Sequence, residues 1–348
     1  MPTILPANQP PARFYRGGAQ INALRGTPSS QEEPCFEPED WVGSTTSCSG
    51  SHPLGLTRLP NGRLLADAIR QDPEYWLGED HVRAFGVDTK LLVKLLDAGQ
   101  RLPVHAHPHD DWVKQYLPTQ AHGKAEAWYI LTLGEVYLGL KEDVEAATLK
   151  QLTLDQRIQG PDGLLGRLHR LEVKPGDAVY VPPGYLHAVG QGVLVVEVQE
   201  PADLSILLEW TGFDLDGLRD GHLGLGWDTA LTAVEIRGYG REHIEQLVVT
   251  KEKRAEKISG KSVFVESSEE YFVMEEIQLE DTSKTISPGF ALLVVLDGNL
   301  TLSTSNANGK ETSTPLTKGN TVLLAHGDGP ARLDGRGQIL VARPPKAE

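Results

Sequence analysis

Three histidines lie close together in one short segment, LPVHAHPHDDW at residues 102–112, although the whole chain of 348 residues holds only 11. In a strand, residues two apart point to the same side, so His105 and His107 would project together. Further along, Glu126 opens the strand-like run EAWYIL, and His187 closes GDAVYVPPGYLH. Three imidazoles and one carboxylate form a mixed nitrogen and oxygen set that suits a divalent metal such as zinc, iron, manganese or nickel.

The third histidine of this segment, His109, is expected to face elsewhere. Pro108 cannot donate a hydrogen bond to a sheet, so the strand should end there and a turn should follow. Asp110 or Asp111 could then cap a short helix that starts at Trp112. The alternative, in which the other two histidines form an exposed pair on an edge strand without a metal, stays open at this point.

The spacing around these residues is more specific than their number. Gly99, five residues and then His105-Ala106-His107 follow the first sequence motif of the cupins, with a longer insert before the glutamate. Gly176, five residues, Pro182-Pro183-Gly184, two residues and His187 follow the second motif, in which Gln191 replaces the final asparagine. The chain thus resembles a metal-binding cupin, a small antiparallel jelly roll whose ligands converge inside the barrel.

The elements that must position these residues are mostly strands. The 36 glycines and 23 prolines punctuate short apolar runs, which is typical of strands joined by turns. Helices are expected around 64–86, 111–117 and 226–239, where apolar residues recur every three or four positions. Strands are expected at 90–98, 126–133, 135–140, 168–173, 177–182, 192–199, 271–279, 290–304, 320–327 and 338–344.

A charged and apparently unstructured stretch at 248–261, VVTKEKRAEKISGK, divides this pattern into two β-rich units. The predicted fold is mainly β, with two cupin-type antiparallel jelly rolls and a few decorating helices. Residues 1–248 would form a metal-binding catalytic cupin domain with helical insertions, and residues 262–348 a degenerate second cupin domain without metal. In the second unit, TKGNTVLLAHG at 317–327 echoes KPGDAVYVPPG at 174–184, each a glycine turn before a buried strand, and His326 is interpreted as a turn residue.

A narrower resemblance rests on four stretches in order: EDWVGS at 39–44, TKLLVKLLDAGQRLPVHAHPHDDW at 89–112, HGKAEAWYIL at 122–131 and VKPGDAVYVPPGYLHAVGQGVLVVEVQEPADL at 173–204. Together they are similar to the type I mannose-6-phosphate isomerases, in particular the short bacterial form, over about residues 39–210. The unit after residue 262 fits that family's degenerate second cupin.

By this resemblance, His107, Glu126 and His187 fall on the family's metal-ligand positions. The implied cofactor is one divalent metal ion, with zinc as the expected metal. His105 stands where relatives often carry glutamine or lysine, and it would add a fourth ligand to the set.

The resemblance also implies two catalytic residues. Lys124 matches the lysine of the family's active site, and Asp203 matches an aspartate implicated in acid/base work and ring opening. The alternatives for these two residues are a solvated surface lysine and a capping or turn aspartate. Glu197 and Gln199 alternate onto one face of their strand, where they would line the same cavity or play a structural role. Weaker candidates are Trp41 and His122.

The implied reaction is the interconversion of mannose 6-phosphate and fructose 6-phosphate, an aldose–ketose isomerisation by proton transfer through a metal-stabilised enediolate. One residue departs from the pattern: Leu207 stands where relatives carry an arginine associated with the phosphorylated substrate, and leucine cannot make guanidinium contacts. Either Arg13, Arg16 or Lys124 compensates, or the protein is a cupin isomerase, epimerase or dioxygenase that acts on an unphosphorylated sugar. A non-enzymatic sugar-binding cupin is the third possibility.

Composition restricts the partners. The chain has 33 basic and 48 acidic residues and a formal charge of -15, which repels phosphate backbones and anionic lipid surfaces. Nucleic acid and membranes are therefore unlikely partners, whereas a small sugar or sugar phosphate fits. The sequence shows no secretory leader and no apolar run long enough to span a membrane, so a cytoplasmic protein is expected. The sequence does not determine the oligomeric state.

Overall fold

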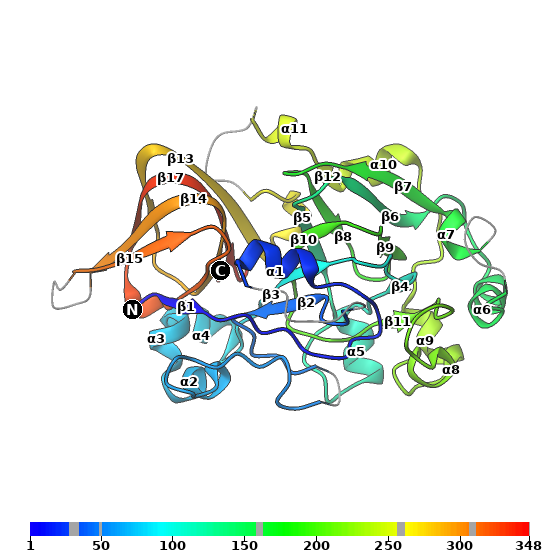
Figure 1. The fold of residues 1–348 in the computed structure, drawn as a ribbon. Helices are drawn as coiled ribbons and strands as arrows, with labels where there is room; N and C mark the ends of the chain where they lie inside the picture. Colours follow the sequence, from blue (N-terminus) through cyan, green and yellow to red (C-terminus); the bar gives the residue numbers. More distant parts are fainter. Residues whose placement is uncertain (28–34, 49–50, 158–162, 256–261, 306–310, 348) are drawn as a thin grey trace.

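The computed structural model describes residues 1–27, 35–48, 51–157, 163–255, 262–305 and 311–347. Two β-rich parts lie side by side (Figure 1), and we call the described residues up to 255 the first unit and the described residues from 262 to 347 the second unit. Neighbouring strands within the sheets run antiparallel. The predicted fold class, mainly β with cupin-type antiparallel sheets and a few decorating helices, is confirmed.

The first unit consists of two sheets. In order, the strands of what we call the inner sheet are β12 (Val248–Val249), β8 (Ala178–Val181), β5 (Glu126–Ile130), β10 (Leu194–Gln199), β3 (Leu92–Asp97) and β2 (Glu39–Val42). The outer sheet holds β11 (Ile206–Leu207), β4 (His105–Ala106), β9 (His187–Val189), β6 (Gly134–Leu140) and β7 (Leu168–Val173). The longer strands β3, β5, β6, β7, β8 and β10 lie within the expected ranges to within a residue, because their branched and aromatic residues favour a pleated, buried backbone. The short strands β2, β4, β9, β11 and β12 lie outside the expected ranges.

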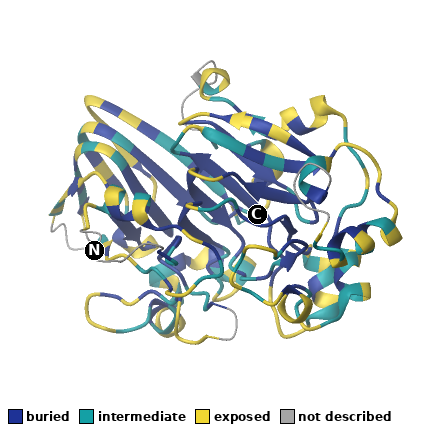
Figure 2. Ribbon diagram, turned by 45° about the vertical axis from the view of Figure 1, so that its right-hand side comes forward, coloured by how far each residue is buried: buried dark blue, intermediate teal, exposed yellow. Residues whose placement is uncertain are grey.

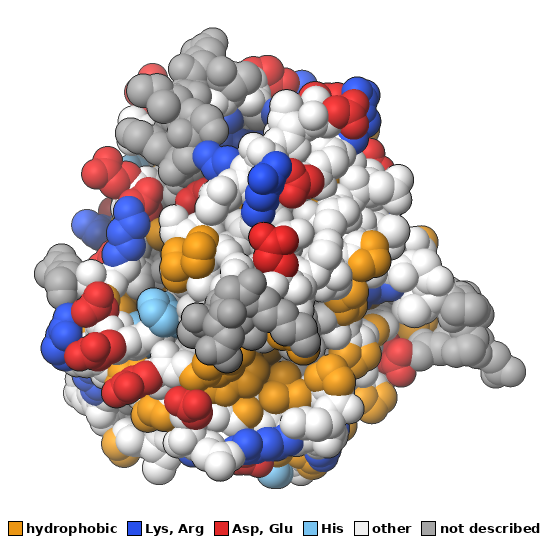
Figure 3. Space-filling model, turned by 90° about the vertical axis from the view of Figure 1, so that its left-hand side faces the viewer, with side chains coloured by type: hydrophobic (Ala, Val, Ile, Leu, Met, Phe, Trp, Pro, Cys, Tyr) orange, Lys and Arg blue, Asp and Glu red, His pale blue; other side chains and the backbone are white. Residues whose placement is uncertain are grey.

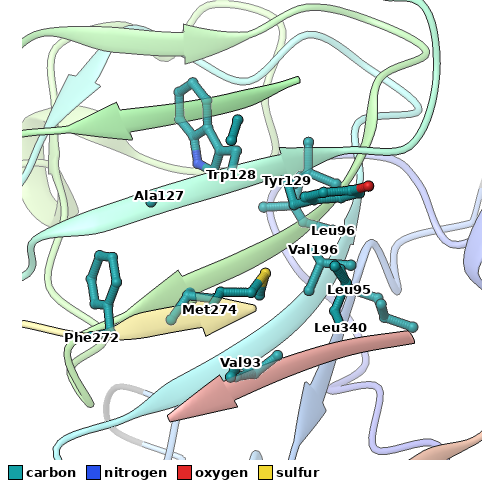
Figure 4. Close-up of a cluster of buried hydrophobic side chains, with 14 of the residues drawn as sticks. Val93, Leu95, Leu96, Ala127, Trp128, Tyr129, Val196, Phe272, Met274 and Leu340 are labelled. Carbon is teal, nitrogen blue, oxygen red and sulfur yellow. The ribbon is translucent and has the colours of Figure 1, made fainter. Parts of the chain in front are cut away.

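One face of the inner sheet is apolar and the other carries polar side chains. Every residue of β3, β5 and β10 is buried, so alternation of apolar and polar residues alone does not reveal the faces. Val93, Leu95 and Val196 lie on one face and join a hydrophobic core that continues into the second unit through Met274 and Leu340, as Figure 4 shows. The residues between them point to the other face, where polar side chains gather. The second unit therefore packs against the back of the sheet that carries the site.

The second unit has one sheet of long strands. Its strands are β13 (Val273–Ile286), β14 (Ala291–Ser305), β15 (Glu311–Thr317), β16 (Thr321–Leu324) and β17 (Ala331–Arg343), with β1 (Thr3–Leu5) paired to β16 at the edge. In β14, Leu292 and Val294 join the core shared with the first unit, whereas Leu293 and Val295 join a separate core inside the second unit. Burial on both faces explains the continuous apolar run at this point of the sequence.

The start of the chain thus contributes a strand to the sheet of the second unit, and the division into residues 1–248 and 262–348 stays a prediction. The linking stretch was expected to be unstructured, which is wrong for its first half. Val248 and Val249 form β12 beside β8, and Lys251–Ala255 form helix α11. Residues 256–261 lie outside the described part of the chain.

Short helices cover the outside, and Figure 2 shows exposed and buried residues alternating along them. The expected helix at 64–86 is three helices, because Pro73 begins α3 directly after its cap Asp72 and Gly78, at φ 92°, separates α3 from α4. The helices, besides α11, are α1 (Ala19–Arg25), α2 (Leu65–Gln71), α3 (Pro73–Leu77), α4 (Glu79–Phe85), α5 (Asp110–Tyr116), α6 (Ala146–Leu154), α7 (Leu164–Arg167), α8 (Gly217–Asp220), α9 (Trp227–Ala230) and α10 (Arg241–Gln246).

Helix α5 starts two residues earlier than the sequence suggested. Its cap is His109, whose Nδ1 accepts a hydrogen bond from the backbone N–H of Asp111 at 3.3 Å, and neither aspartate plays that role. The prediction that His109 faces away from the other two histidines holds, because its side chain is exposed at the helix start.

The left-hand side of the molecule in Figure 1, where the second unit and helices α2 to α4 lie, carries both apolar and charged side chains. Viewed from that side, hydrophobic side chains gather on the lower half of the face, with acidic and basic groups around them (Figure 3). His326 is exposed in a one-turn 3-10 helix that follows β16. Among the described helices, none is both long and apolar enough to cross a membrane.

Candidate metal centre

Three imidazoles meet between the two sheets of the first unit. His105 of β4 and His187 of β9 are antiparallel partners, with ring centroids 4.0 Å apart. His107 follows β4 directly, and its ring centroid lies 5.0 Å from that of His105 and 4.8 Å from that of His187. All three side chains are buried, and their ligand atoms lie within 4.8 Å of one another.

Backbone carbonyls fix the tautomer of each ring. Nδ1 of His105 lies 2.8 Å from the carbonyl oxygen of Pro103, that of His107 2.7 Å from Leu204 O, and that of His187 2.8 Å from Tyr185 O. A carbonyl can only accept, so each Nδ1 must carry the proton and donate it. In a neutral ring the Nε2 lone pair is then left pointing into the centre, which is the arrangement of metal-binding histidines.

Glu126 meets these nitrogens from the inner sheet. Its Oε2 lies 3.0 Å from His107 Nε2, and its Oε1 lies 3.2 Å from His187 Nε2. Among the described residues, His187 Nε2 is buried without a hydrogen-bond partner. The lone pair of His187 Nε2 and the carboxylate oxygen of Glu126 repel each other at this distance unless a cation lies between them. The residues therefore fit a divalent metal ion.

Burial keeps two of the imidazoles neutral. It lowers the pKa of His105 well below its usual value, with the neighbouring histidines adding to the effect. Burial, together with the Lys124 ammonium, lowers the pKa of His107 to about 3. A neutral imidazole is the form that binds metal, so the surroundings of these rings favour a ligand role.

Lys124 lies inside the same cluster. Its Nζ is 2.7 Å from His107 Nε2, 2.5 Å from Glu126 Oε2 and 3.6 Å from Glu197 Oε1. The side chain is only 6% exposed, which excludes the alternative of a solvated surface lysine. The ammonium is therefore positioned against the predicted metal ligands.

A second set of buried charges continues from this point across the inner sheet. Trp41, Lys94, Glu197 and Trp128 are successive cross-strand partners on β2, β3, β10 and β5. Lys94 Nζ lies 3.4 Å from Glu39 Oε2 and 3.9 Å from Glu197 Oε1. Burial, and then the charge of Glu126, raise the pKa of Glu197 to about 7.

Sequence reasoning missed Lys94 and Glu39. The signal for Lys94 was present, because a lysine in the middle of the apolar run LLVKLL cannot be buried without a partner. Glu39 gave no comparable signal. It accepts hydrogen bonds from Tyr15 Oη at 2.6 Å and Trp41 Nε1 at 2.8 Å, contacts that exist only in the folded chain.

These groups open into a cavity of about 610 Å³. His105, Lys124, Glu126 and Glu197 line it on one side, and Asp203 lines it as well. Asp203 Oδ1 lies 3.5 Å from a guanidinium nitrogen of Arg13, so the alternative of a purely capping aspartate does not account for its position. Leu207 contributes an apolar wall.

The chain is similar to known proteins in both sequence and fold. A family model described as "Mannose-6-phosphate isomerase, cupin domain" matches residues 260–344. Mannose-6-phosphate isomerase ManA of Bacillus subtilis is 30% identical over 342 residues, which cover 89% of this chain and 97% of that protein. This chain belongs to the mannose-6-phosphate isomerase family. The family consists of sugar isomerases, and the resemblance seen in the sequence is confirmed.

Two further comparisons agree with this membership. The probable mannose-6-phosphate isomerase GmuF of Bacillus subtilis is 39% identical over 199 residues, which span 50% of this chain and 58% of that protein. The fold matches a crystal structure of a phosphomannose isomerase variant from Salmonella typhimurium, with a TM-score of 0.76, 18% identity, and coverage of 99% of this chain and 100% of that one. At that identity the match shows the fold alone.

In this member of the mannose-6-phosphate isomerase family, three further candidates from the sequence, Trp41, Gln199 and His122, do not line the cavity. Trp41 is fully buried behind Lys94, whose Nζ sits 4.6 Å from the centre of its ring. Gln199 is buried and donates to the backbone oxygens of Glu200 and Ala202. His122 contacts Asp88 Oδ2 at 2.5 Å and does not line the cavity.

Proposed function

We propose that this protein is a metal-dependent aldose–ketose isomerase that moves a proton between the first two carbons of a sugar. The observation that carries the proposal is a cluster of three buried histidines, two of which face the Glu126 carboxylate beside Lys124, at the edge of a cavity large enough for a hexose. Membership of the mannose-6-phosphate isomerase family supports the same reaction class.

The four residues that would hold one divalent ion are His105, His107, Glu126 and His187. A set rich in imidazole nitrogen suits zinc. When bound, such an ion supplies a Lewis acid that polarises the oxygens on the first two carbons of the sugar.

The chain's own acid and base groups complete the proposal. The Lys124 ammonium donates a hydrogen bond to Glu126, and from this position it can hold a proton at a sugar oxygen as charge develops there. Asp203 faces the same cavity, and Arg13 orients its carboxylate, which can accept a proton from a sugar hydroxyl during ring opening. The apolar wall around Leu204 and Leu207 keeps water from the reacting carbons.

Mannose 6-phosphate, the substrate in the names of the relatives, is the reference compound for a test. The protein, loaded with zinc, would be incubated in deuterated water with mannose, fructose, lyxose and the 6-phosphates of the two hexoses. We expect deuterium at the second carbon of one sugar pair, and no exchange after a chelator removes the metal. Incorporation that continues without metal, or none with any compound, would contradict the proposal. The cytoplasmic location remains a prediction that this test does not address.

A further inference from the structure

The cations of the cavity are all engaged by carboxylates of the same cavity. Among the described residues that line it, the cationic side chains are Arg13, Lys94, Lys124 and Arg219, and the carboxylates are Glu39, Glu126, Glu197, Asp203 and Asp220. Each cation has a carboxylate oxygen within 4.0 Å. The lining therefore offers acidic groups in excess and no cation without an anionic partner.

Arg13 contacts two carboxylates. Its Nε and a terminal nitrogen both lie 3.3 Å from Glu39 Oε1, and the same terminal nitrogen lies 3.5 Å from Asp203 Oδ1. Glu39 is in turn fixed by hydrogen bonds from Tyr15 and Trp41. A ligand that took this guanidinium would have to separate it from two carboxylates that are only 4% and 14% exposed, which is unfavourable.

Arg219 stands at the exposed edge of the cavity. Its guanidinium makes two parallel hydrogen bonds to Asp220, at 2.8 and 2.7 Å, and both side chains line the cavity. An anion that approached Arg219 would meet the charge of Asp220 at the same place. The other compensating residue considered from the sequence, Arg16, is exposed and lies outside this cavity.

We infer that the substrate is an unphosphorylated sugar. A phosphomonoester carries close to two negative charges at neutral pH and is bound by cations that are free to make charge-assisted hydrogen bonds. Sugar hydroxyls are different, because each can donate to a carboxylate and accept from an ammonium or guanidinium group without separating the existing pairs. The inference rests on the proposed function, since isomerisation places the first two carbons at the histidines and the sixth carbon away from the metal.

The apolar lining of the cavity at Leu207 also favours an unphosphorylated sugar as the substrate. Its side chain is 7% exposed, lies on the strand next to His105 and shares the lining with Leu204 and Leu223. Apolar side chains pack well against the C–H faces of a sugar and stabilise no charge. The cavity thus combines paired charges with apolar surface, which suits a neutral polyol.

The test compares matched pairs on the zinc-loaded protein. Initial rates of isomerisation are measured for mannose against mannose 6-phosphate and for fructose against fructose 6-phosphate. We expect kcat/KM to favour the neutral member by about tenfold or more, because a like charge beside Asp203 or Asp220 disfavours the ester. A preference for the ester overturns the inference and leaves the isomerase proposal intact. No turnover of any of the four sugars overturns both.

A variant checks the charge argument itself. Asp220→Asn releases Arg219 at an exposed position, so folding should be unaffected. We expect it to raise kcat/KM for the ester relative to the neutral sugar by about tenfold, whereas Asp228→Asn, at an exposed aspartate paired with Lys150 elsewhere, should leave the ratio unchanged. A ratio that does not move in Asp220→Asn shows that carboxylate pairing does not exclude phosphate and overturns the inference.

Discussion

Leu207 lies directly opposite His105 in the antiparallel pairing of β11 and β4. By the resemblance described in the sequence analysis, these are two positions at which this chain differs from related sequences, with an imidazole at 105 and no arginine at 207. Side chains of a cross-strand pair share a face of the sheet. A guanidinium at 207 would place a permanent positive charge beside an imidazole that already faces two others, so the leucine is compatible with His105 as a ligand.

His105→Gln tests whether this imidazole is a metal ligand. The glutamine can still reach the centre, but its amide is a weaker ligand than a neutral imidazole. We expect zinc affinity, measured by competition with a chromogenic chelator, to fall by at least about 10–100-fold. Changes to residues that only orient metal ligands already cause losses of this size. His326→Gln, at an exposed histidine of the second unit, serves as the control. Equal affinity in the two variants would remove His105 from the ligand set.

Lys124→Met separates metal binding from turnover. The methionine preserves the length of the side chain and removes the ammonium that lies between Glu126 and Glu197. We expect bound zinc to be retained and the rate of proton exchange at the second carbon to fall by about 10²–10⁴-fold, the range for a lost acid/base group. Lys114→Met, at an exposed lysine of α5, should change neither quantity. Loss of metal together with activity would instead make Lys124 a structural residue of the metal site.

The histidine cluster was predictable because its signal is local. Motif spacing singled out His105, His107, Glu126 and His187. The structure brings the three imidazoles together and places Glu126 beside His107 and His187, while their role as metal ligands stays a prediction. The partners of Glu39 were not predictable, because Arg13, Tyr15 and Lys94 come from segments that meet it only in the folded chain. Spacing along the chain contains no information about such contacts.

Some strands of the second unit's sheet could not be predicted from the sequence either. The first half of β17 was missed because DGRG at 334–337 has the composition of a turn, yet these residues pair with β13 and β14. Gly335, at φ 118°, and Gly337 allow the strand to bend there without a Cβ clash against the neighbouring backbone. β1 and β15 were missed because they are short or polar edge strands, and no apolar run marks them.

Glu200 should make stability depend on pH. It is buried, its Oε2 accepts from Ala125 N at 2.9 Å, and the charged groups around it are Asp110, His122 and Lys90. Burial, together with the charge of Asp110, raises its pKa from 4.5 to about 7. Between these values the unfolded chain loses the proton and the folded chain keeps it, so stability falls as pH rises through this window.

Glu200→Gln should remove this dependence, because the amide oxygen can still accept from Ala125 and carries no charge. The free energy of unfolding of the variant minus that of the parent should increase by on the order of 2–3 kcal/mol between pH 4.5 and 7. Urea unfolding at several pH values measures the difference. Glu242→Gln, at an exposed glutamate of α10, is the control. A difference that shrinks with rising pH would mean that Glu200 is ionised and stabilised by His122 and Lys90.

Phe272 tests whether the two units unfold together. Its ring is fully buried in the core that also contains Val93 and Val196 of the inner sheet. Phe272→Ala should lower the free energy of unfolding by about 3–5 kcal/mol, and Phe272→Leu by clearly less, because leucine leaves a smaller cavity. Since one core joins the units, we expect a single transition in metal-free protein, with tryptophan fluorescence and far-UV circular dichroism changing at the same urea concentration. The contrary result would be two separate transitions, of which Phe272→Ala shifts only one. It would show that the second unit folds independently and that the stability of the inner sheet does not depend on it.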